Sequence, residues 1–176
     1  MRIAVVGTSS GSGKTTLSRR LAALLGVPHV ELDALYHGPG WVPADDFEDK
    51  VDTTIAAPGW VVDGNYFGRL GDRVISRADI VVWLDLPLRT CLSRLARRTA
   101  IRLWGREVLW NGNREGLRSS VLARNGLFLF TIRTHSARMR KWPVRLAPFK
   151  SVRLRSEQQV ADWFEEFRQS QSETIS

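Results

Sequence analysis

The first sixteen residues, MRIAVVGTSSGSGKTT (1–16), contain the pattern that decides the fold. An apolar run at 3–6 ends at Gly7, a turn rich in glycine and serine follows, and Lys14 opens an amphipathic helical pattern. Small residues in such a turn allow successive backbone N–H groups to surround an anion, and the N-terminus of the following helix adds its positive dipole end. The stretch therefore predicts a phosphate-binding loop (P-loop) between a strand and a helix.

The loop itself supplies candidate ligands for the phosphate chain of a nucleotide. Lys14 brings a mobile positive charge to the outer phosphates, and the hydroxyl of Thr15 is placed to ligate Mg²⁺. A plain glycine-rich turn is the alternative interpretation, whereas a dinucleotide-binding loop would need a third glycine that is missing here. The residues expected to bind the nucleotide are Gly11, Ser12, Gly13, Lys14, Thr15 and Thr16.

The spacing of this motif is irregular at its start. The pattern G-x-x-x-x-G-K-[ST] requires glycine six residues before the lysine, where this chain has Thr8, and Gly7 lies one residue further back. Either Thr8 tolerates the turn or the loop carries one extra residue. We therefore expect the contacts with the phosphates to come from Gly11 to Thr16 and not from the preceding residues.

Composition sets limits on the class of protein. A chain of 176 residues fits one domain, expected over 1–170 with a disordered tail at 171–176. No apolar run has the length of a membrane span, and the phosphate-binding strand stands where a signal peptide would begin. The lone Cys91 cannot form an intramolecular disulfide and is expected to be a small core residue. These features favour a cytoplasmic protein without a membrane partner.

The positive charge is concentrated in one segment. The whole chain has a formal net charge of +8, but residues 89–155 contain 17 Lys or Arg and 2 Asp or Glu. Residues 1–88 contain 8 basic and 11 acidic side chains. A polyanionic ligand is therefore expected at the basic segment.

Five short apolar stretches alternate with helical patterns along the chain. Continuous apolar strands of this kind are typical of a parallel sheet that is covered by helices on both faces, which predicts a three-layer α/β/α sandwich with five strands. Ligands of such sheets bind beyond the carboxyl ends of the strands. Four residues follow predicted strand ends and are expected to face one crevice: Gly7, Asp33, Asp63 and Asp85.

The stretches GSGKTTL (11–17), VELDALY (30–36), WVVDGNY (60–66), ADIVVWLDLP (78–87) and WNGNRE (110–115) carry a family resemblance. They resemble the nucleoside-monophosphate-kinase-like branch of P-loop proteins and, more narrowly, the adenylate-kinase-like bacterial topology modulation (FlaR-related) proteins. The resemblance extends to about residue 140. It implies an ATP- and Mg²⁺-dependent kinase with a small Arg-rich lid at about 104–118.

The resemblance also implies roles for single residues. Asp63 matches an acid that holds Mg²⁺ through water, with an ordinary Asp-Gly turn as the alternative. Arg94 matches an arginine that stacks on the nucleotide base, and Arg98 one that contacts phosphate. Their spacing places both on one face of a helix, although a solvated arginine face would look the same. Arg106 and Arg114 are the candidates to close over the phosphates from the lid.

The acceptor side departs from the resemblance. Nucleoside-monophosphate kinases hold the acceptor phosphate with an arginine after the second strand, but residues 38–59 contain no arginine and only Lys50. The acceptor therefore need not be a nucleoside monophosphate. A carboxylate at Asp33 could orient and deprotonate an acceptor hydroxyl, with a structural cap of the following turn as the alternative.

Two hypotheses about function follow from the residues. The first is a phosphotransferase that moves the γ-phosphoryl of ATP to a small hydroxyl or phosphate acceptor, with Lys14, Asp33, Arg98, Arg106 and Arg114 as its catalytic residues. The second is a nucleic-acid-binding ATPase or polynucleotide-end kinase that uses the basic segment 89–155. A GTPase switch is disfavoured because the guanine-reading Asn/Thr-Lys-x-Asp motif is absent from the sequence.

Overall fold

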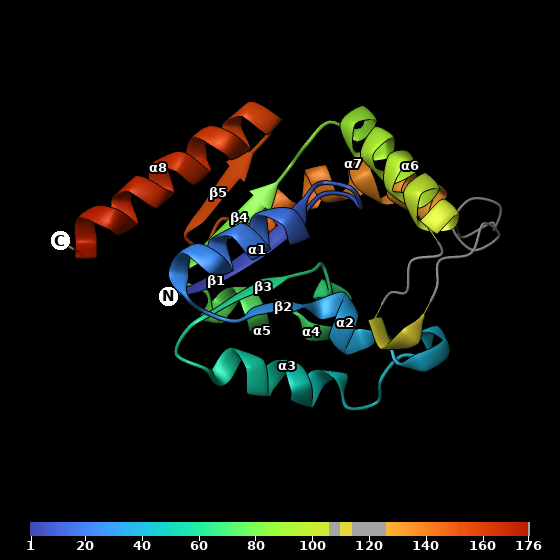
Figure 1. Ribbon diagram of the computed structural model, residues 1–176, viewed down its shortest axis with the longest axis horizontal. Helices are drawn as coiled ribbons and strands as arrows, with labels where there is room; N and C mark the ends of the chain where they lie inside the picture. The colour runs from blue at the N-terminus through green and yellow to red at the C-terminus, as the bar shows by residue number, and fades with distance from the viewer. Residues whose placement is uncertain (106–109, 114–125, 176) are drawn as a thin grey trace.

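A five-stranded, fully parallel sheet forms the centre of the molecule (Figure 1). The structure is a computed structural model that describes residues 1–105, 110–113 and 126–175. The strands have the order β2-β3-β1-β4-β5, so the P-loop strand occupies the middle of the sheet. Their bounds are β1 (Arg2–Gly7), β2 (His29–Glu31), β3 (Trp60–Asp63), β4 (Ile80–Leu84) and β5 (Ser151–Leu154).

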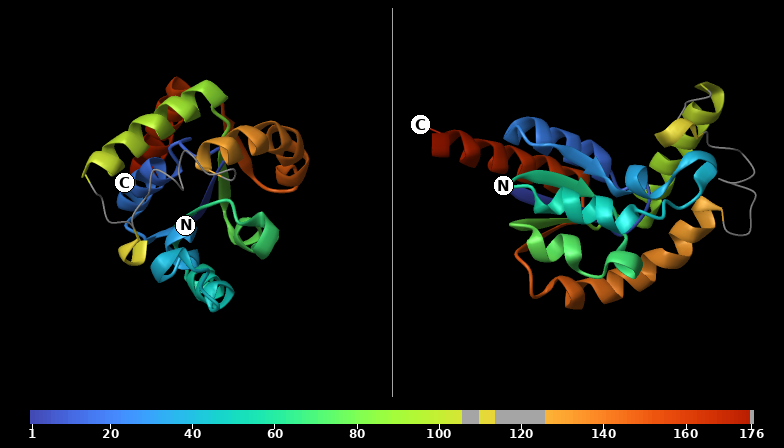
Figure 2. Two further views of the ribbon diagram at one scale, coloured as in Figure 1. Left: turned by 90° about the vertical axis from the view of Figure 1, so that its right-hand side faces the viewer. Right: turned by 90° about the horizontal axis from the view of Figure 1, so that it is seen from below.

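Helices cover both faces of the sheet, as the two turned views in Figure 2 show. One face packs against α1 (Lys14–Leu25) and α8 (Glu157–Ile175) through a core that includes Ile3, Val5, Leu21 and Phe164. The opposite face packs against α3 (Phe47–Ala56), α4 (Phe67–Leu70), α5 (Arg73–Arg77) and the C-terminal part of α7 (Leu127–Leu146). The predicted α/β/α sandwich is therefore confirmed.

The alternation along β1 explains how one strand supports two cores. Ile3 and Val5 face the α1 side, whereas Ala4 and Val6 face the α3 side, and all four are buried. Successive side chains of a strand point to opposite faces, so a strand that is covered on both faces has to be apolar throughout. Because β1 lies between β3 and β4, the P-loop follows the carboxyl end of the central strand.

A glycine with left-handed backbone angles stands at each end of the first helix. Gly13 precedes α1 with φ 91°, and Gly26 follows it with φ 62° and donates its N–H to the carbonyl of Ala22. Glycine adopts these angles without the steric cost that other residues incur. The last helix begins with a side-chain cap, because the hydroxyl of Ser156 accepts the N–H of Gln159.

Several boundaries differ from the sequence expectation. β2 ends at Glu31, and α2 (Leu32–Tyr36) begins there, so Asp33 lies in the first turn of a short helix and not at the end of a strand. Leu32 turns into the core at this point and packs tightly beside Gly64. A 3-10 turn, η1 (Pro39–Trp41), follows α2.

α8 continues to Ile175, into the segment expected to be disordered. The short helices α4 and α5 lie between β3 and β4. α6 (Leu88–Gly105) agrees with the predicted arginine-rich helix. Only a second 3-10 turn, η2 (Trp110–Gly112), and the neighbouring Asn113 are described between α6 and residue 126. Within the described residues, no helix combines the length and the apolar character that crossing a membrane requires.

Candidate active site

A cleft of about 1140 Å³ lies at the carboxyl ends of the strands. It begins beside α8, passes along the P-loop and α6, and reaches α2, η1 and the start of α7. The position agrees with the rule that parallel sheets bind their ligands at this edge. The sequence-predicted residues that line it are Ser12, Gly13, Lys14, Thr15, Thr16, Gly11, Asp33, Asp63, Arg94 and Arg98.

The middle of the P-loop is fixed against α6. Gly11 has φ 79°, and a Cβ atom there would lie 2.4 Å from the carbonyl oxygen of Cys91. Only glycine fits this backbone approach without a shift of the helix. Ser12 is buried beside it, and its hydroxyl has no hydrogen-bond partner among the described residues. A buried hydroxyl without a partner at a loop of backbone N–H groups suits an anionic ligand.

The irregular spacing at Thr8 has a structural explanation. Thr8 is fully buried, its hydroxyl donates to Asp85 Oδ1 at 2.6 Å, and Trp83 Nε1 donates to the same hydroxyl at 2.8 Å. Its backbone φ is not in the left-handed region, so no glycine is required. Arg153 donates to the other carboxylate oxygen of Asp85 at 2.6 Å. Thr8 thus anchors the loop to the sheet.

The same contacts correct the expectation for Asp85. This residue was expected to face the crevice, but it is buried beneath the P-loop and both of its carboxylate oxygens accept hydrogen bonds from protein side chains. The reason is the position of Thr8, which fills the space between the loop and the end of β4. Asp85 therefore supports the loop and does not line the cleft.

Asn65 ties the start of the P-loop to the end of β3. Its Oδ1 accepts the N–H of Gly7 at 3.1 Å, and its Nδ2 donates to the carbonyl of Gly7 at 2.6 Å. The two bonds satisfy both backbone groups of a residue at the edge of the sheet. No local pattern in the sequence predicts this role, because the contact joins residues 58 positions apart.

Lys14 lies among charged groups of both signs. Burial lowers the pKa of Lys14, and the guanidinium groups of Arg138 and Arg98 lower it further. The carboxylates of Asp63 and Asp33 act in the opposite direction. Burial disfavours the charged form of this lysine. A polyanion that binds beside it stabilises the ammonium form, because the new negative charge opposes the effect of burial.

Thr15 and Asp63 form the candidate metal position. The hydroxyl of Thr15 lies 3.5 Å from Asp63 Oδ1, and Asp63 Oδ2 is 2.8 Å from His29 Nε2. A hydroxyl and a carboxylate are hard oxygen ligands, and Mg²⁺ is bound by few protein oxygens with the remaining positions filled by water and phosphate. The two residues therefore fit Mg²⁺, and His29 orients the carboxylate. Among the described residues there is no larger cluster of His, Cys, Asp and Glu that could hold a metal.

Two arginines of α6 line the cleft together, in agreement with the common helix face that their spacing predicts. Arg94 Nη1 lies 3.5 Å from the carbonyl of Ser12, and its Nη2 forms an ion pair of 3.0 Å with Glu157 at the start of α8. Arg98 lies one turn further along α6 and also lines the cleft. Arg106 and Arg114, the two predicted lid arginines, lie outside the described residues.

Asp33 and Tyr66 form a polar pair at the far end of the cleft. The Tyr66 hydroxyl donates to Asp33 Oδ1 at 2.7 Å. Burial and the neighbouring carboxylate of Asp33 raise the pKa of Tyr66 well above its usual range, so this hydroxyl stays protonated and keeps donating. The ring of Tyr66 packs on Tyr36 with centroids 4.8 Å apart, and Tyr36 contacts the ring of His37.

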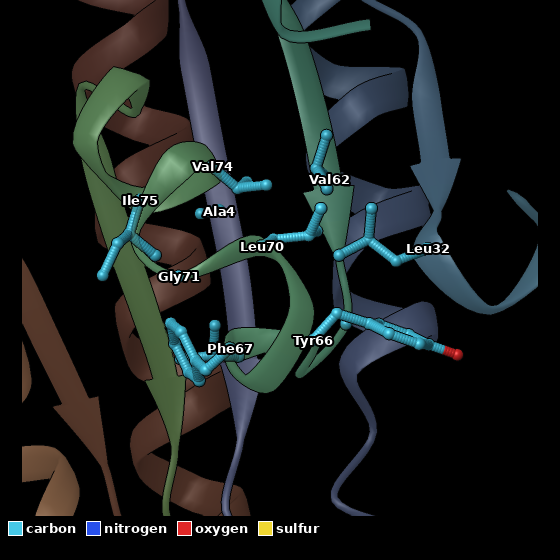
Figure 3. Close-up of a pocket in the computed structure, with 11 residues that line it drawn as sticks. Ala4, Leu32, Val62, Tyr66, Phe67, Leu70, Gly71, Val74 and Ile75 are labelled. Carbon is cyan, nitrogen blue, oxygen red and sulfur yellow. The ribbon is translucent and has the colours of Figure 1, made fainter. Parts of the chain in front are cut away.

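A second pocket lies below this pair, between β1, β3, α4 and α5 (Figure 3). Ala4, Val62, Leu70 and Val74 line it, and Tyr66 directs its hydroxyl away from it. Its volume of about 20 Å³ is close to that of a single water molecule, and its wall is apolar. It is a small packing defect of the core rather than a ligand site.

Helix α7 contributes contacts that sequence reasoning missed. His135 Nδ1 lies 2.7 Å from the hydroxyl of Ser9, and Arg138 Nη1 donates to the carbonyl of Thr8 at 3.2 Å. Burial lowers the pKa of His135, and burial likewise lowers the pKa of Arg138. Arg138 also lines the cleft. Helix α7 therefore supports the first half of the P-loop and brings a further cation to it.

The chain was compared with known protein families, sequences and solved structures. No protein-family model matches the chain. The cytidylate kinase of Pyrococcus horikoshii is 28% identical over 115 residues, which is 56% of this chain and 58% of that protein. The chain thus aligns with less than two thirds of the length of this relative.

Solved structures match over nearly the whole chain. A shikimate kinase from Acinetobacter baumannii in complex with shikimate matches with a TM-score of 0.60 and 16% identity, covering 99% of this chain and 94% of that chain. The fold is that of a P-loop kinase. A deoxyadenosine kinase from M. mycoides matches with a TM-score of 0.58 and 14% identity, covering 96% of this chain and all of that chain. The fold expected from the resemblance is confirmed, whereas the narrower resemblance to topology modulation proteins stays a prediction.

Proposed function

We propose that this protein is an ATP- and Mg²⁺-dependent phosphotransferase that moves the γ-phosphoryl group of ATP to a hydroxyl group of a small molecule. One observation carries the proposal: a single cleft joins the P-loop to the carboxylate of Asp33. A phosphate-binding loop and a carboxylate base in one cleft are the two elements that transfer to a hydroxyl requires.

The residues of the cleft have distinct parts in this reaction. The acceptor oxygen forms a bond to the γ-phosphorus, the bond from that phosphorus to the bridging oxygen breaks, and ADP leaves with the electron pair. The hydroxyl proton passes to the carboxylate of Asp33, which the Tyr66 hydroxyl holds in place at 2.7 Å. Lys14 and Arg98 stabilise the charge on the equatorial oxygens, since phosphoryl transfer depends on positioning and on charge stabilisation.

The nucleotide is expected to lie along the P-loop with its base toward α8. Arg94, which lies between the loop and the first turn of α8, would stack on the base. Thr15 and Asp63 would hold Mg²⁺, which when bound neutralises charge on the phosphate oxygens. Arg106 and Arg114 remain proposed lid residues.

A hydroxyl acceptor is favoured over a phosphate-bearing one by the charges near Asp33. Lys50 is the only basic residue between 38 and 59, and its ammonium group pairs with Asp46 at 2.8 Å on the surface of α3. Arg69 lies over the ring of Tyr36 at 5.6 Å and does not line the cleft. No side chain of α3 therefore offers a bidentate grip on an acceptor phosphate.

A steady-state assay of ADP release with a panel of acceptors tests the proposal. The panel contains sugars, sugar acids, nucleosides and nucleoside monophosphates, and at least one hydroxyl compound is expected to raise ADP release above the rate with ATP alone. Asp33→Asn should lower kcat by about 100-fold or more and leave the Kd for ATP within about twofold. Asp45→Asn, a change of an exposed carboxylate, is the matched control and should leave kcat unchanged.

Two outcomes would contradict the proposal. One is that no compound of the panel stimulates ADP release. The other is that Asp33→Asn keeps the full rate, which would leave the P-loop without its catalytic base.

A further inference from the structure

Two asparagines join the segment 110–113 to the backbone of residues 34–41, which we call the acceptor loop. Asn113 Oδ1 accepts the N–H of Trp41 at 3.1 Å, and Asn113 Nδ2 donates to the carbonyl of Gly38 at 2.9 Å. Asn111 Nδ2 donates to the carbonyl of His37 at 2.6 Å and lies 3.3 Å from that of Ala34. A plain turn at residues 111–113 would not account for these four contacts.

Asn113 is a buried side chain that holds the backbone of the acceptor loop, and not an exposed residue that touches it by chance. Asn113 is 4% exposed, although it belongs to a short described segment between α6 and α7. Its amide bridges Gly38 and Trp41 and so closes a loop of four residues with both of its functional groups. A buried amide that satisfies two backbone groups fixes their relative position, because breaking either bond leaves a buried polar group without a partner.

Backbone strain coincides with this junction. Among the described residues only two that are not glycine have positive φ, Trp41 with 63° and Asn111 with 56°. Asparagine tolerates this region, whereas a bulky residue such as tryptophan enters it only where surrounding contacts hold it. The left-handed conformation of Trp41 therefore depends on the bond that its N–H donates to Asn113.

The strained backbone determines where two aromatic rings lie. His37 and Trp41 both line the cleft, and their ring centroids are 5.2 Å apart in an edge-to-face arrangement. His37 also contacts Tyr36, whose ring packs on Tyr66 beside Asp33. The acceptor loop therefore forms an aromatic wall on the side of the cleft where the base lies.

We propose that Asn111 and Asn113 are positioning residues for the acceptor. They hold the backbone from Ala34 to Trp41 so that His37 and Trp41 form a fixed wall, and this wall sets the size of the hydroxyl compound that reaches Asp33. The inference rests on the proposed function for its kinetic part. Its structural part, the fixation of the acceptor loop, stands without it.

Hydrogen exchange of the unliganded protein tests the structural part. In Asn113→Ala the peptides that cover 34–41 are expected to exchange about tenfold faster, because the amide of Trp41 loses its acceptor. Asn111→Ala should accelerate exchange in the same peptides to a smaller extent and provides a second variant if Asn113→Ala folds poorly. Gln158→Ala, which removes an exposed side-chain hydrogen bond to Asp162 on α8, is the control and should change nothing in 34–41.

Kinetics with a hydroxyl compound from the acceptor panel test the positioning part. Asn113→Ala should raise the KM for that compound about tenfold, keep kcat within about threefold and keep the KM for ATP within about twofold. Discrimination against bulkier homologues of the compound should fall, a change that loss of folded protein alone would not produce. Asn113→Asp keeps the oxygen that accepts from Trp41 and should recover part of the selectivity.

Unchanged exchange in residues 34–41 of Asn113→Ala would overturn the proposal, and so would unchanged acceptor KM and selectivity in an active enzyme. If no compound of the panel stimulates ADP release, the proposed function fails instead. The exchange measurement then decides by itself whether the two asparagines fix the loop.

Discussion

Thr8 shows at the scale of one residue why the P-loop departs from the regular motif. Its hydroxyl is shared between Asp85 and Trp83 in a fully buried position, and its N–H donates to the carbonyl of Leu84 at 3.0 Å. Glycine at this position would supply the regular spacing but none of the side-chain bonds. The loop therefore relies on a buried polar network where other P-loops rely on backbone freedom.

Thr8→Gly is expected to destabilise the protein although it restores the regular spacing. The change leaves Trp83 Nε1 and one oxygen of Asp85 without their partner, which costs about 2–4 kcal/mol in the free energy of unfolding. Thr8→Ser keeps the hydroxyl and should cost about 1 kcal/mol or less. Urea denaturation of the three proteins measures the difference. A midpoint of Thr8→Gly at or above that of the unmodified protein would refute the role of the network.

Tyr66→Phe removes the donor that holds Asp33 while the ring stays in place. The rate constant kcat with the identified acceptor is expected to fall about tenfold, since the carboxylate loses one hydrogen bond and its fixed orientation. Phe67→Leu, a change of the adjacent aromatic residue that lacks a hydroxyl, is the control. A kcat of Tyr66→Phe equal to that of the unmodified protein would contradict this role of the Tyr66 hydroxyl.

At the scale of elements, α7 links the P-loop to the C-terminal half of the chain. His135 contacts Ser9, and Asp85 and Arg138 are the charged groups that influence the pKa of His135 besides its burial. The net effect lowers this pKa below its usual value near 6.5. The neutral imidazole is therefore the form that the folded protein favours.

This pKa shift predicts a loss of stability in acid. Below about pH 6.5 the unfolded chain takes up a proton at His135 before the folded chain does, so this contribution is complete above that pH and declines as the pH falls toward the lowered pKa. The slope is at most about 1.4 kcal/mol per pH unit. His135→Gln should show a shallower decline of the urea midpoint between pH 7.5 and pH 5.5 than the unmodified protein. Equal slopes for the two proteins would contradict the assignment.

The same helix shows where the sequence was informative and where it was not. The strand, loop and helix around Lys14 could be predicted because their pattern is local, and Arg94 and Arg98 because helical spacing fixes their common face. The contact of Ser9 with His135 joins residues 126 positions apart, and no local pattern records it. Asp33 was identified correctly as a cleft residue but on the wrong element, because burial of Leu32 ended β2 early.

At the scale of the whole molecule, much of the basic segment is used inside the fold. Arg153 pairs with Asp85, Arg145 with Asp72 and Arg94 with Glu157, while Arg138 donates to the P-loop. Each of these pairs joins the segment 89–155 to an acidic part of the chain. The net charge of +15 that the sequence suggests for this segment is thus partly neutralised by the folded structure.

From this charge distribution we expect the protein to bind nucleic acid weakly and in a salt-sensitive way. The exposed cations Arg133, Arg140 and Lys141 of α7 should attract a polyanion at 50 mM salt through release of its counterions. Neutralisation of about three phosphates of a single strand gives a slope near −2 in log affinity against log salt, so affinity should fall about 20-fold between 50 and 200 mM. Fluorescence anisotropy of a labelled 20-nucleotide DNA and RNA at both salt concentrations measures this slope, with the triple change of these cations to glutamine as the matched variant.

Micromolar or tighter binding that persists at 200 mM, together with ATP-dependent labelling of the 5′ hydroxyl end, would instead assign the polynucleotide as the acceptor.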